Sequence, residues 1–282
     1  MSSPIAAIVI SILSWWFATG VVIILARRGS GRGALTMGLM TGAAMAALWA
    51  ITLSAQIVSV GGVYVAFASA IVVWAWHEVS FLLGIITGPR RTALPAHVEG
   101  RARFAAAFAA VRDHELLLFA TMIGLIWLLR DAPNQTAMWS FVLLWVMRVS
   151  TKLNIFLGAP NAVSDLLPVR LDYLKSYFRT DRVSPIFVSS LCVAVLITLT
   201  CVFHANLSVS QAHTVSWTIL ATFATLGIIE HLFLVMPIRD ADLWPMLVPK
   251  RKTISTSTIT DRVMASSKPE PTMKKSTARQ GA

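Results

Sequence analysis

Three times in this chain a histidine stands directly beside a glutamate, as His77-Glu78, His114-Glu115 and Glu230-His231. Each pair lies within or at the edge of a long apolar stretch. An ionisable side chain inside a bilayer costs roughly 2.5 kcal/mol or more unless it is paired, neutralised or hydrated, so such residues mark a candidate functional site. We therefore expect the three pairs to meet in one polar cluster.

A second polar group lies in the segment 147–161, which carries Arg148, Lys152 and Asn154. Arg148 and Lys152 are four residues apart, so on a helix they share a face, where like charges repel. They require anionic partners, and the candidates are Glu78, Glu115 and Glu230. Three carboxylates then face two cations, and a protonated carboxylate, a charged histidine, water or a bound cation must settle the imbalance.

One chemistry that fits these residue types is a metal centre. Imidazoles and carboxylates from several helices form the mixed nitrogen and oxygen shell of di-iron carboxylate bundles, and such a shell could hold two iron or manganese ions. The candidate ligands are His77, Glu78, His114, Glu115, Glu230 and His231. Adjacent residues on a helix diverge by about 100°, however, and the Glu-x-x-His spacing of those bundles is absent.

Two other interpretations use the same residues. A neutral histidine such as His77 or His231 could be the axial ligand of a tetrapyrrole, with Trp74 and Trp76 stacking on a flat ligand. Alternatively, the cluster is a buried network of ion pairs and hydrogen bonds that fixes how the helices are aligned. The sequence leaves all three interpretations open.

The elements that must position these residues are membrane helices. Of the 282 residues 56% are hydrophobic and 13% are charged, and the mean hydropathy is +0.70. Soluble domains carry roughly 25% charged residues. A span needs about 20 mainly apolar residues, and the fold class we predict is an all-α bundle of seven transmembrane helices. Their predicted ranges are 5–26, 35–56, 62–87, 113–129, 135–157, 186–204 and 214–238. The fourth continues an amphipathic helix that begins near Ala102.

The distribution of positive residues predicts the orientation of the bundle, because Lys and Arg near span ends remain on the cytoplasmic side. With seven spans, 23 of the 24 basic residues fall on one side, and Arg130 alone falls opposite. The N-terminus is then periplasmic and the C-terminus cytoplasmic. This topology places the polar residues of spans 3, 4, 5 and 7 in the cytoplasmic leaflet.

Helical spacing predicts which way two of the histidines point. Ala70, His77 and Gly84 are separated by sevens, and small residues mark close helix approaches in membranes. Gly227 and His231 are four residues apart and share a face. We therefore expect His77 and His231 to face protein rather than lipid.

Residues 1–249 are predicted to form the transmembrane domain, and residues 250–282 a disordered, basic cytoplasmic tail. The formal net charge of +11 requires no nucleic-acid partner. It is typical of cytoplasmic loops that face anionic lipid head groups.

Two motifs carry a resemblance to a known family. They are Trp76-His-Glu-Val-Ser-Phe-Leu followed by Thr87-Gly-Pro-Arg, and Met147-Arg-Val-Ser-Thr-Lys-Leu-Asn-Ile-Phe-Leu-Gly-Ala-Pro-Asn161. Over about residues 1–250 the chain resembles the PuhE family, photosynthetic complex assembly proteins of anoxygenic phototrophic bacteria. The resemblance implies a multi-pass protein of the bacterial inner membrane, cytoplasmic or intracytoplasmic. Its implied partners are subunits of the reaction centre and light-harvesting complex, or their assembly factors.

The resemblance supplies a process but no catalytic residues, so three functions remain open. The protein could be a scaffold that holds reaction-centre or antenna subunits. It could handle a pigment, presenting bacteriochlorophyll or a precursor. It could also be a metal-dependent oxidoreductase that acts within the membrane on a tetrapyrrole, quinone or carotenoid.

Overall fold

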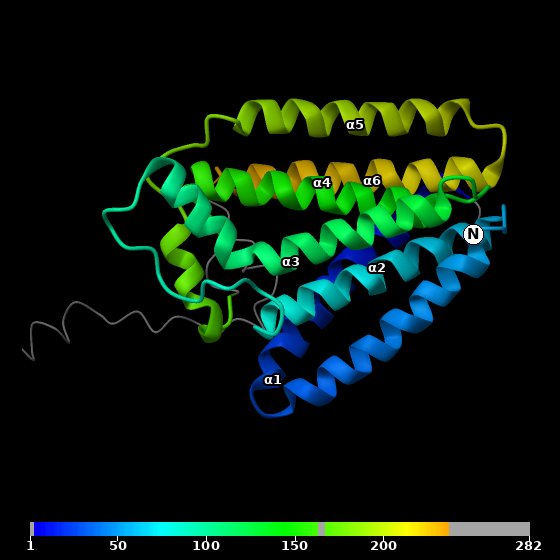
Figure 1. The fold of residues 1–282 in the computed structure, drawn as a ribbon. Coiled ribbons are helices and arrows are strands. Elements are labelled where there is room, and N and C mark those ends of the chain that lie inside the picture. The colour runs from blue at the N-terminus through cyan, green and yellow to red at the C-terminus, as the bar shows by residue number, and fades with distance from the viewer. Residues whose placement is uncertain (1–2, 163–166, 237–282) are drawn as a thin grey trace, which may run out of the picture. The chain divides into compact units, whose positions relative to one another are not determined.

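The architecture comes from a computed structural model, which describes residues 3–162 and 167–236, apart from the side chains of residues 28–32. The described residues form helices joined by loops and include no strand. Figure 1 shows the arrangement of these helices. Their bounds are α1 Pro4–Ser54, α2 Val60–Leu82, α3 Gly100–Leu129, α4 Thr136–Leu157, a 3₁₀ helix Val169–Tyr177, α5 Phe187–Leu207 and α6 Gln211–Phe233. The predicted tail, residues 250–282, lies outside the described part.

Six helical segments in the described residues are long and apolar enough to cross a membrane. They are Pro4–Arg27, Gly33–Ser54, Val60–Leu82, Thr136–Leu157, Phe187–Leu207 and Gln211–Phe233. These segments make the chain a multi-pass membrane protein. Helix α3, which contains the predicted span 113–129, is not among them, because Arg112, Asp113 and Glu115 leave only residues 116–129 of its C-terminal part without charge.

Helix α1 contains two antiparallel membrane segments. Both ends of α1 lie near the start of α2. Ala7 packs in one core cluster with Val63 of α2, and Ile51 packs in a second cluster with Ala66 of α2. A straight helix of 51 residues would be roughly 76 Å long, more than twice the thickness of a bilayer core. The chain must therefore reverse between the two segments, as the sequence predicts.

Helix α2 ends five residues before the predicted boundary at residue 87. Gly84 has φ +71°, a left-handed conformation that favours glycine. The amide of Gly84 donates to the carbonyl of Phe81 at 2.8 Å, and that of Ile85 to the carbonyl of Ser80 at 3.0 Å. This pair of bonds is the Schellman motif, which terminates a helix. The prediction that Gly84 shares a helical face with His77 is therefore wrong, because the helix has already ended.

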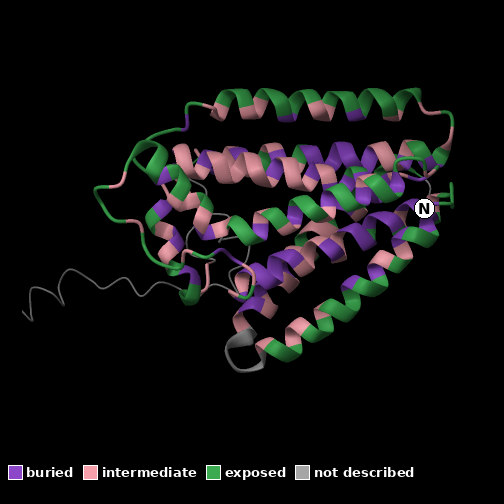
Figure 2. Ribbon diagram, viewed as in Figure 1, coloured by how far each residue is buried: buried purple, intermediate pink, exposed green. Residues whose placement is uncertain are grey.

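The core lies where α2, α4 and α6 meet. Phe67 of α2 and Phe223 of α6 pack edge to face, with ring centroids 5.1 Å apart, and Phe141 of α4 is fully buried. Figure 2 shows buried residues concentrated in α2 and α6, whereas α5 is exposed over most of its surface. Only Ala194 and Cys201 of α5 are buried, and Ile197 packs against the core, so most other apolar side chains of α5 are available to lipid or to another protein.

We call the end of the bundle where α2, α4 and α6 finish, and where α3 begins, the polar end. The 3₁₀ helix closes this end through Arg170. The Arg170 guanidinium donates to the carbonyl of Leu83 at 3.2 Å and to that of Ala26 at 2.9 Å. Because the last carbonyls of a helix lack intrahelical partners, a cation placed there stabilises the helix end.

Candidate functional site

Helix α4 carries the two cations at the centre of the predicted cluster. A guanidinium nitrogen of Arg148 donates to a carboxylate oxygen of Glu78 on α2 at 2.9 Å. One turn further on, the Lys152 ammonium forms an ion pair with Glu115 on α3. Two of the three expected carboxylates are therefore the partners of the two cations. The ion pairs join α4 to the helices on either side of it, α2 and α3.

His77 and His114 lie beside these ion pairs. Both imidazoles are buried, and their ring centroids are 6.5 Å apart. His77 Nε2 is 3.1 Å from the hydroxyl of Thr121. Neither ring nitrogen of His114 has a hydrogen-bond partner among the described residues, and the ring of Phe81 lies over His114 at 4.6 Å. As predicted, His77 faces protein.

His231 lies on another side of α4, in a second polar group. Its Nε2 is 2.8 Å from the hydroxyl of Ser150, and its Nδ1 is 2.7 Å from the carbonyl of Gly227. Asn154, one turn beyond Ser150, donates to the hydroxyl of Ser190 on α5 at 2.9 Å. The predicted orientation of His231 toward protein is confirmed. Its described hydrogen bonds join α4 and α6, with no contact to His77 or His114 among them.

The third carboxylate, Glu230, accepts a hydrogen bond from the indole nitrogen of Trp15 on α1 at 2.9 Å. Its charge also acts on Arg148. Glu230 therefore belongs to the electrostatic surroundings of the cluster, although Arg148 forms its ion pair with Glu78. The indole of Trp15 thereby joins α1 to α6.

The arrangement does not bring the predicted metal ligands together. Among the described residues, no three His, Cys, Asp or Glu side chains are placed to hold one metal ion. One reason is helix geometry, because adjacent residues on a helix diverge by about 100°. The other is that Glu78 and Glu115 form ion pairs with Arg148 and Lys152. His77 and His114 approach each other, while His231 bonds elsewhere.

The predicted tryptophan platform also takes a different form. The ring of Trp74 packs on Phe141 at 5.3 Å, within the core. Trp76 contacts His77 edge to face at 4.9 Å, and its indole nitrogen donates to the hydroxyl of Thr41. Neither indole lines the cavity between α3 and α4 or the one at the opposite end of the bundle. Both ring nitrogens of His231 are engaged, so this residue cannot serve as an axial ligand in this arrangement.

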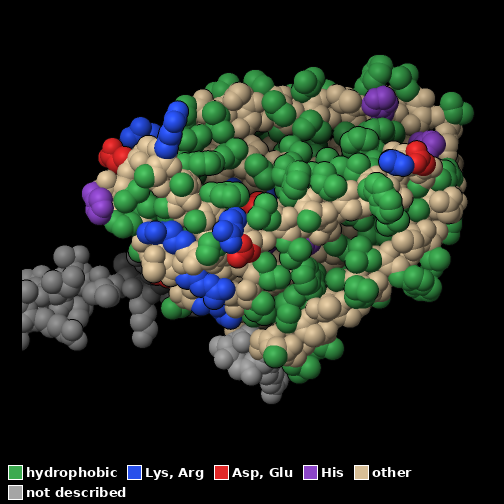
Figure 3. All heavy atoms as spheres, in the orientation of Figure 1, with side chains coloured by type: hydrophobic (Ala, Val, Ile, Leu, Met, Phe, Trp, Pro, Cys, Tyr) green, Lys and Arg blue, Asp and Glu red, His purple; other side chains and the backbone are tan. Residues whose placement is uncertain are grey.

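A cavity of about 500 Å³ lies between α3 and α4 at the polar end, with the 3₁₀ helix forming one wall. Its lining is mainly aromatic and aliphatic, and Glu115, Arg148 and Lys152 are its charged residues. Phe104 and Phe119, which also line it, are about half exposed, so the cavity opens sideways between the two helices. Figure 3 shows charged side chains recessed in an otherwise hydrophobic face, with Lys and Arg gathered toward one end.

Arg103 lies beside this cavity, in contact with two of its lining residues. Its guanidinium lies 3.9 Å above the ring centroid of Phe156 and donates to the carbonyl of Tyr177 at 2.8 Å. Burial lowers the pKa of Arg103, and the nearby positive charge of Arg179 lowers it further. An arginine remains charged despite such a shift, because its ordinary pKa exceeds 12. The carboxylate of Asp181 acts on Arg103 in the opposite direction and pairs with Arg179 and Arg182.

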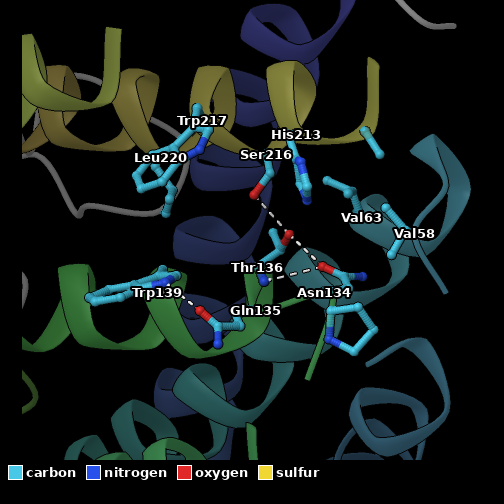
Figure 4. Close-up of a pocket in the computed structure, with 12 residues that line it drawn as sticks. Val58, Val63, Asn134, Gln135, Thr136, Trp139, His213, Ser216, Trp217 and Leu220 are labelled. Atoms are coloured by element: carbon cyan, nitrogen blue, oxygen red, sulfur yellow. Dashed lines mark hydrogen bonds between the residues drawn. The ribbon is translucent and has the colours of Figure 1, made fainter. Parts of the chain in front are cut away.

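A smaller cavity of about 170 Å³ lies at the opposite end of the bundle (Figure 4). The hydroxyl of Thr136 donates to the side-chain oxygen of Asn134 at 2.7 Å and lies 2.8 Å from the hydroxyl of Ser216. The Asn134 amide in turn donates to the carbonyl of Ser54 at 3.0 Å. These polar groups satisfy one another and tie α1, α4 and α6 together, so we assign this cavity a structural role.

Several partners in the site were not predicted from the sequence. Thr121 lies seven residues after His114 on the same helical face, a spacing that could have revealed it. Ser150 lies inside the motif 147–161, but the rotation of α4 that directs it toward α6 depends on packing. Ser190 and Phe81 gave no local signal. The cavity arises from the separation of two helices, which composition does not encode.

Comparisons with known proteins add a family and a relative. Residues 1–255 match the family described as "Protein of unknown function (DUF3623)". The chain is 32% identical over 253 residues to a Rhodobacter capsulatus protein described as "Uncharacterized 30.4 kDa protein in puhA 5'region". That alignment covers 88% of this chain and 92% of the relative. No solved structure matches. Since the family match covers nearly the whole chain, this protein belongs to the DUF3623 family.

Proposed function

We propose that this protein is a membrane assembly factor for the bacterial photosynthetic reaction centre and its light-harvesting complex. The observation that carries the proposal is the relative in the puhA 5′ region, because puhA is a photosynthesis gene. The motifs at Trp76 and Met147, which resemble the PuhE family, support the same process. A multi-pass architecture also suits a protein that acts on membrane subunits.

The proposed topology has seven spans, with a periplasmic N-terminus and a cytoplasmic C-terminus in the bacterial inner membrane. In this topology α3 crosses the membrane as the fourth span in chain order. The proposal is supported by the ion pair of Glu115 with Lys152, because a paired carboxylate costs less in a membrane than a free one. The polar end then lies in the cytoplasmic leaflet. There the basic loops would meet anionic lipid head groups.

The scaffold role would use the outer surfaces of the bundle. Helix α5 has only two buried residues, and the second segment of α1 exposes Leu39, Met45 and Trp49. Without a hydrophobic driving force between helices in lipid, association depends on close packing and a defined shape. The internal ion pairs would maintain that shape while a reaction-centre or antenna subunit is held.

Deleting the gene in a phototrophic host tests the proposed process. We expect the membranes to lose most of the near-infrared absorbance of assembled complexes, while free bacteriochlorophyll is still made. Expression of the intact chain from a plasmid should restore the absorbance. Unchanged complexes in the deletion strain, at wild-type growth rates under light, would contradict an assembly role.

Pigment handling is a second candidate function, and the cavity between α3 and α4 favours it. A volume of about 500 Å³ falls within the usual range for small-molecule sites, roughly 300–1,000 Å³. The oxidoreductase interpretation has no comparable support, because the described residues include no grouping of three metal ligands.

A further inference from the structure

The cavity between α3 and α4 has the form of an elongated slot with aromatic walls. Eight of its lining side chains are aromatic. Phe104 meets Phe156 edge to face at 5.8 Å, and Phe119 meets Trp145 at 5.7 Å. Each pair joins α3 to α4, and the two are separated by 15 residues of α3, or roughly 22 Å of helix. Aromatic rings prefer stacked or edge contacts with other π systems, so this wall favours a planar conjugated molecule.

The charged residues of the slot lie between these two ring pairs. Arg148 and Lys152 on α4 face Glu115 on α3 within the lining. Glu78 neutralises Arg148 from α2, and Glu230 also acts on Arg148 from outside the lining. Within the lining itself, two cations face one carboxylate. One negative charge on a ligand would match the second cation of the lining.

Phe81 connects the slot to the buried histidines. Its ring lines the cavity, lies 4.6 Å from the ring of His114, and has the Lys152 ammonium 5.6 Å from its centroid. A molecule in the slot would therefore contact the same aromatic ring that covers His114. The polar cluster and the cavity therefore lie on opposite sides of Phe81.

We infer that this slot binds a lipophilic, planar conjugated molecule that carries a single carboxylate, which pairs with Lys152, while its apolar body lies between the aromatic rings. In the photosynthetic setting proposed above, on which this inference rests, a chlorophyll-type tetrapyrrole with a free propionate has that chemistry. The sideways opening leaves the bound molecule accessible from the lipid. Trp74 and Trp76 take no part in this site.

Titration of purified full-length protein in detergent tests the inference, with chlorophyllide a and its methyl ester as probes. Binding is followed by the shift of the pigment absorbance and by quenching of tryptophan fluorescence. We expect the acid to bind at least tenfold more tightly than the ester, because only the acid can pair with Lys152. Equal affinities would overturn the assignment of the head group.

Four variants locate the site. Lys152→Met should weaken acid binding about tenfold and leave the ester unchanged, whereas Glu115→Gln should not weaken the acid, because Glu115 competes for the same ammonium. Leu116→Trp should fill the slot and abolish binding of both probes. Leu128→Trp is its matched control, since Leu128 is similarly exposed on α3 but does not line the slot. If Lys152→Met fails to fold, the two tryptophan variants still locate the site. Loss of probe binding in both tryptophan variants, or in neither, would overturn the assigned location.

Competition and complementation separate the remaining outcomes. Phosphatidylglycerol at equal concentration should not displace chlorophyllide a; displacement would identify the occupant as an anionic lipid and overturn the planar ligand.

Leu116→Trp should also lower complex assembly in the deletion strain. Full assembly with a blocked slot would overturn the site's part in assembly and leave the assembly role itself intact. Normal complexes in the deletion strain, with chlorophyllide still bound in vitro, would instead contradict the assembly role alone.

Discussion

At the scale of single residues, the site consists of ionisable groups held in pairs. Arg148 with Glu78 and Lys152 with Glu115 each place opposite charges in contact at the polar end. Burial makes such charges costly, and pairing offsets the cost only while both partners are present. The same geometry therefore makes each partner sensitive to the loss of the other.

The pair Glu78 and Arg148 yields the first prediction. Glu78→Gln should destabilise the protein by about 3 kcal/mol, because it leaves the Arg148 charge without its partner. The double variant Glu78→Gln with Arg148→Gln should recover part of that loss. Thermal unfolding in detergent, with the wild type and both single variants as references, measures the coupling. Additive effects of the two substitutions would show that the pair does not interact.

His114 yields a second prediction, because neither of its ring nitrogens has a hydrogen-bond partner among the described residues. Replacing a buried unsatisfied polar group by an apolar one is close to neutral or stabilising. His114→Leu should therefore keep or raise the midpoint of thermal unfolding. If complex assembly falls while stability is kept, the imidazole has a functional role. A large loss of stability would contradict this account of its surroundings.

At the scale of elements, α4 organises the bundle. Along its last three turns it contacts α2 through Arg148, α6 through Ser150, α3 through Lys152 and α5 through Asn154. After it ends, Asn161 caps α6, its side-chain amide donating to the carbonyl of Val235 at 2.8 Å. The motif that carries the family resemblance is thus the structural centre of the polar end.

The end of α4 depends on a close approach at Gly158. A Cβ added there would lie 2.7 Å from the carbonyl oxygen of Arg182 and 2.9 Å from the amide of Ser184. Gly158→Ala should therefore cost about 1–3 kcal/mol, the usual effect of overpacking. Gly124→Ala is the control, because no atom lies within 4 Å of its added Cβ. Equal unfolding midpoints for both variants would contradict the close packing of the segment after α4.

Sequence reasoning predicted the elements better than their contacts. Hydropathy located six of the seven predicted spans to within about five residues, since a bilayer requires about 20 apolar residues whatever their neighbours are. The charges of the segment 147–161 led to the carboxylate partners of Arg148 and Lys152, while the common membrane depth of the polar groups stays a prediction. Sequence reasoning missed that His231 and Ser150 face away from His77, because the rotation of a helix about its axis is decided by packing. The end of α2 could not be predicted, because it depends on the positive φ of Gly84.

At the scale of the whole molecule, the topology is a prediction that reporter fusions can check. Alkaline phosphatase, which is active only in the periplasm, should be active when fused after Asp131 and inactive when fused after His97. A fluorescent protein that folds only in the cytoplasm should give the opposite pattern. The expected cause is that this topology places 23 of the 24 Lys and Arg residues on the cytoplasmic side. Activity of the phosphatase at both positions would mean that α3 does not cross the membrane.

The central claim is that the polar cluster around α4 is what the protein uses in its photosynthetic role. The most direct measurement is the near-infrared absorbance of membranes from a deletion strain that expresses variants at matched protein levels. Glu78→Leu and Glu230→Leu should reduce the assembled complexes several-fold, whereas His204→Leu and His213→Leu, at the opposite end of the bundle, should leave them near wild-type levels. Equal or reversed severity between the two sets would contradict the claim.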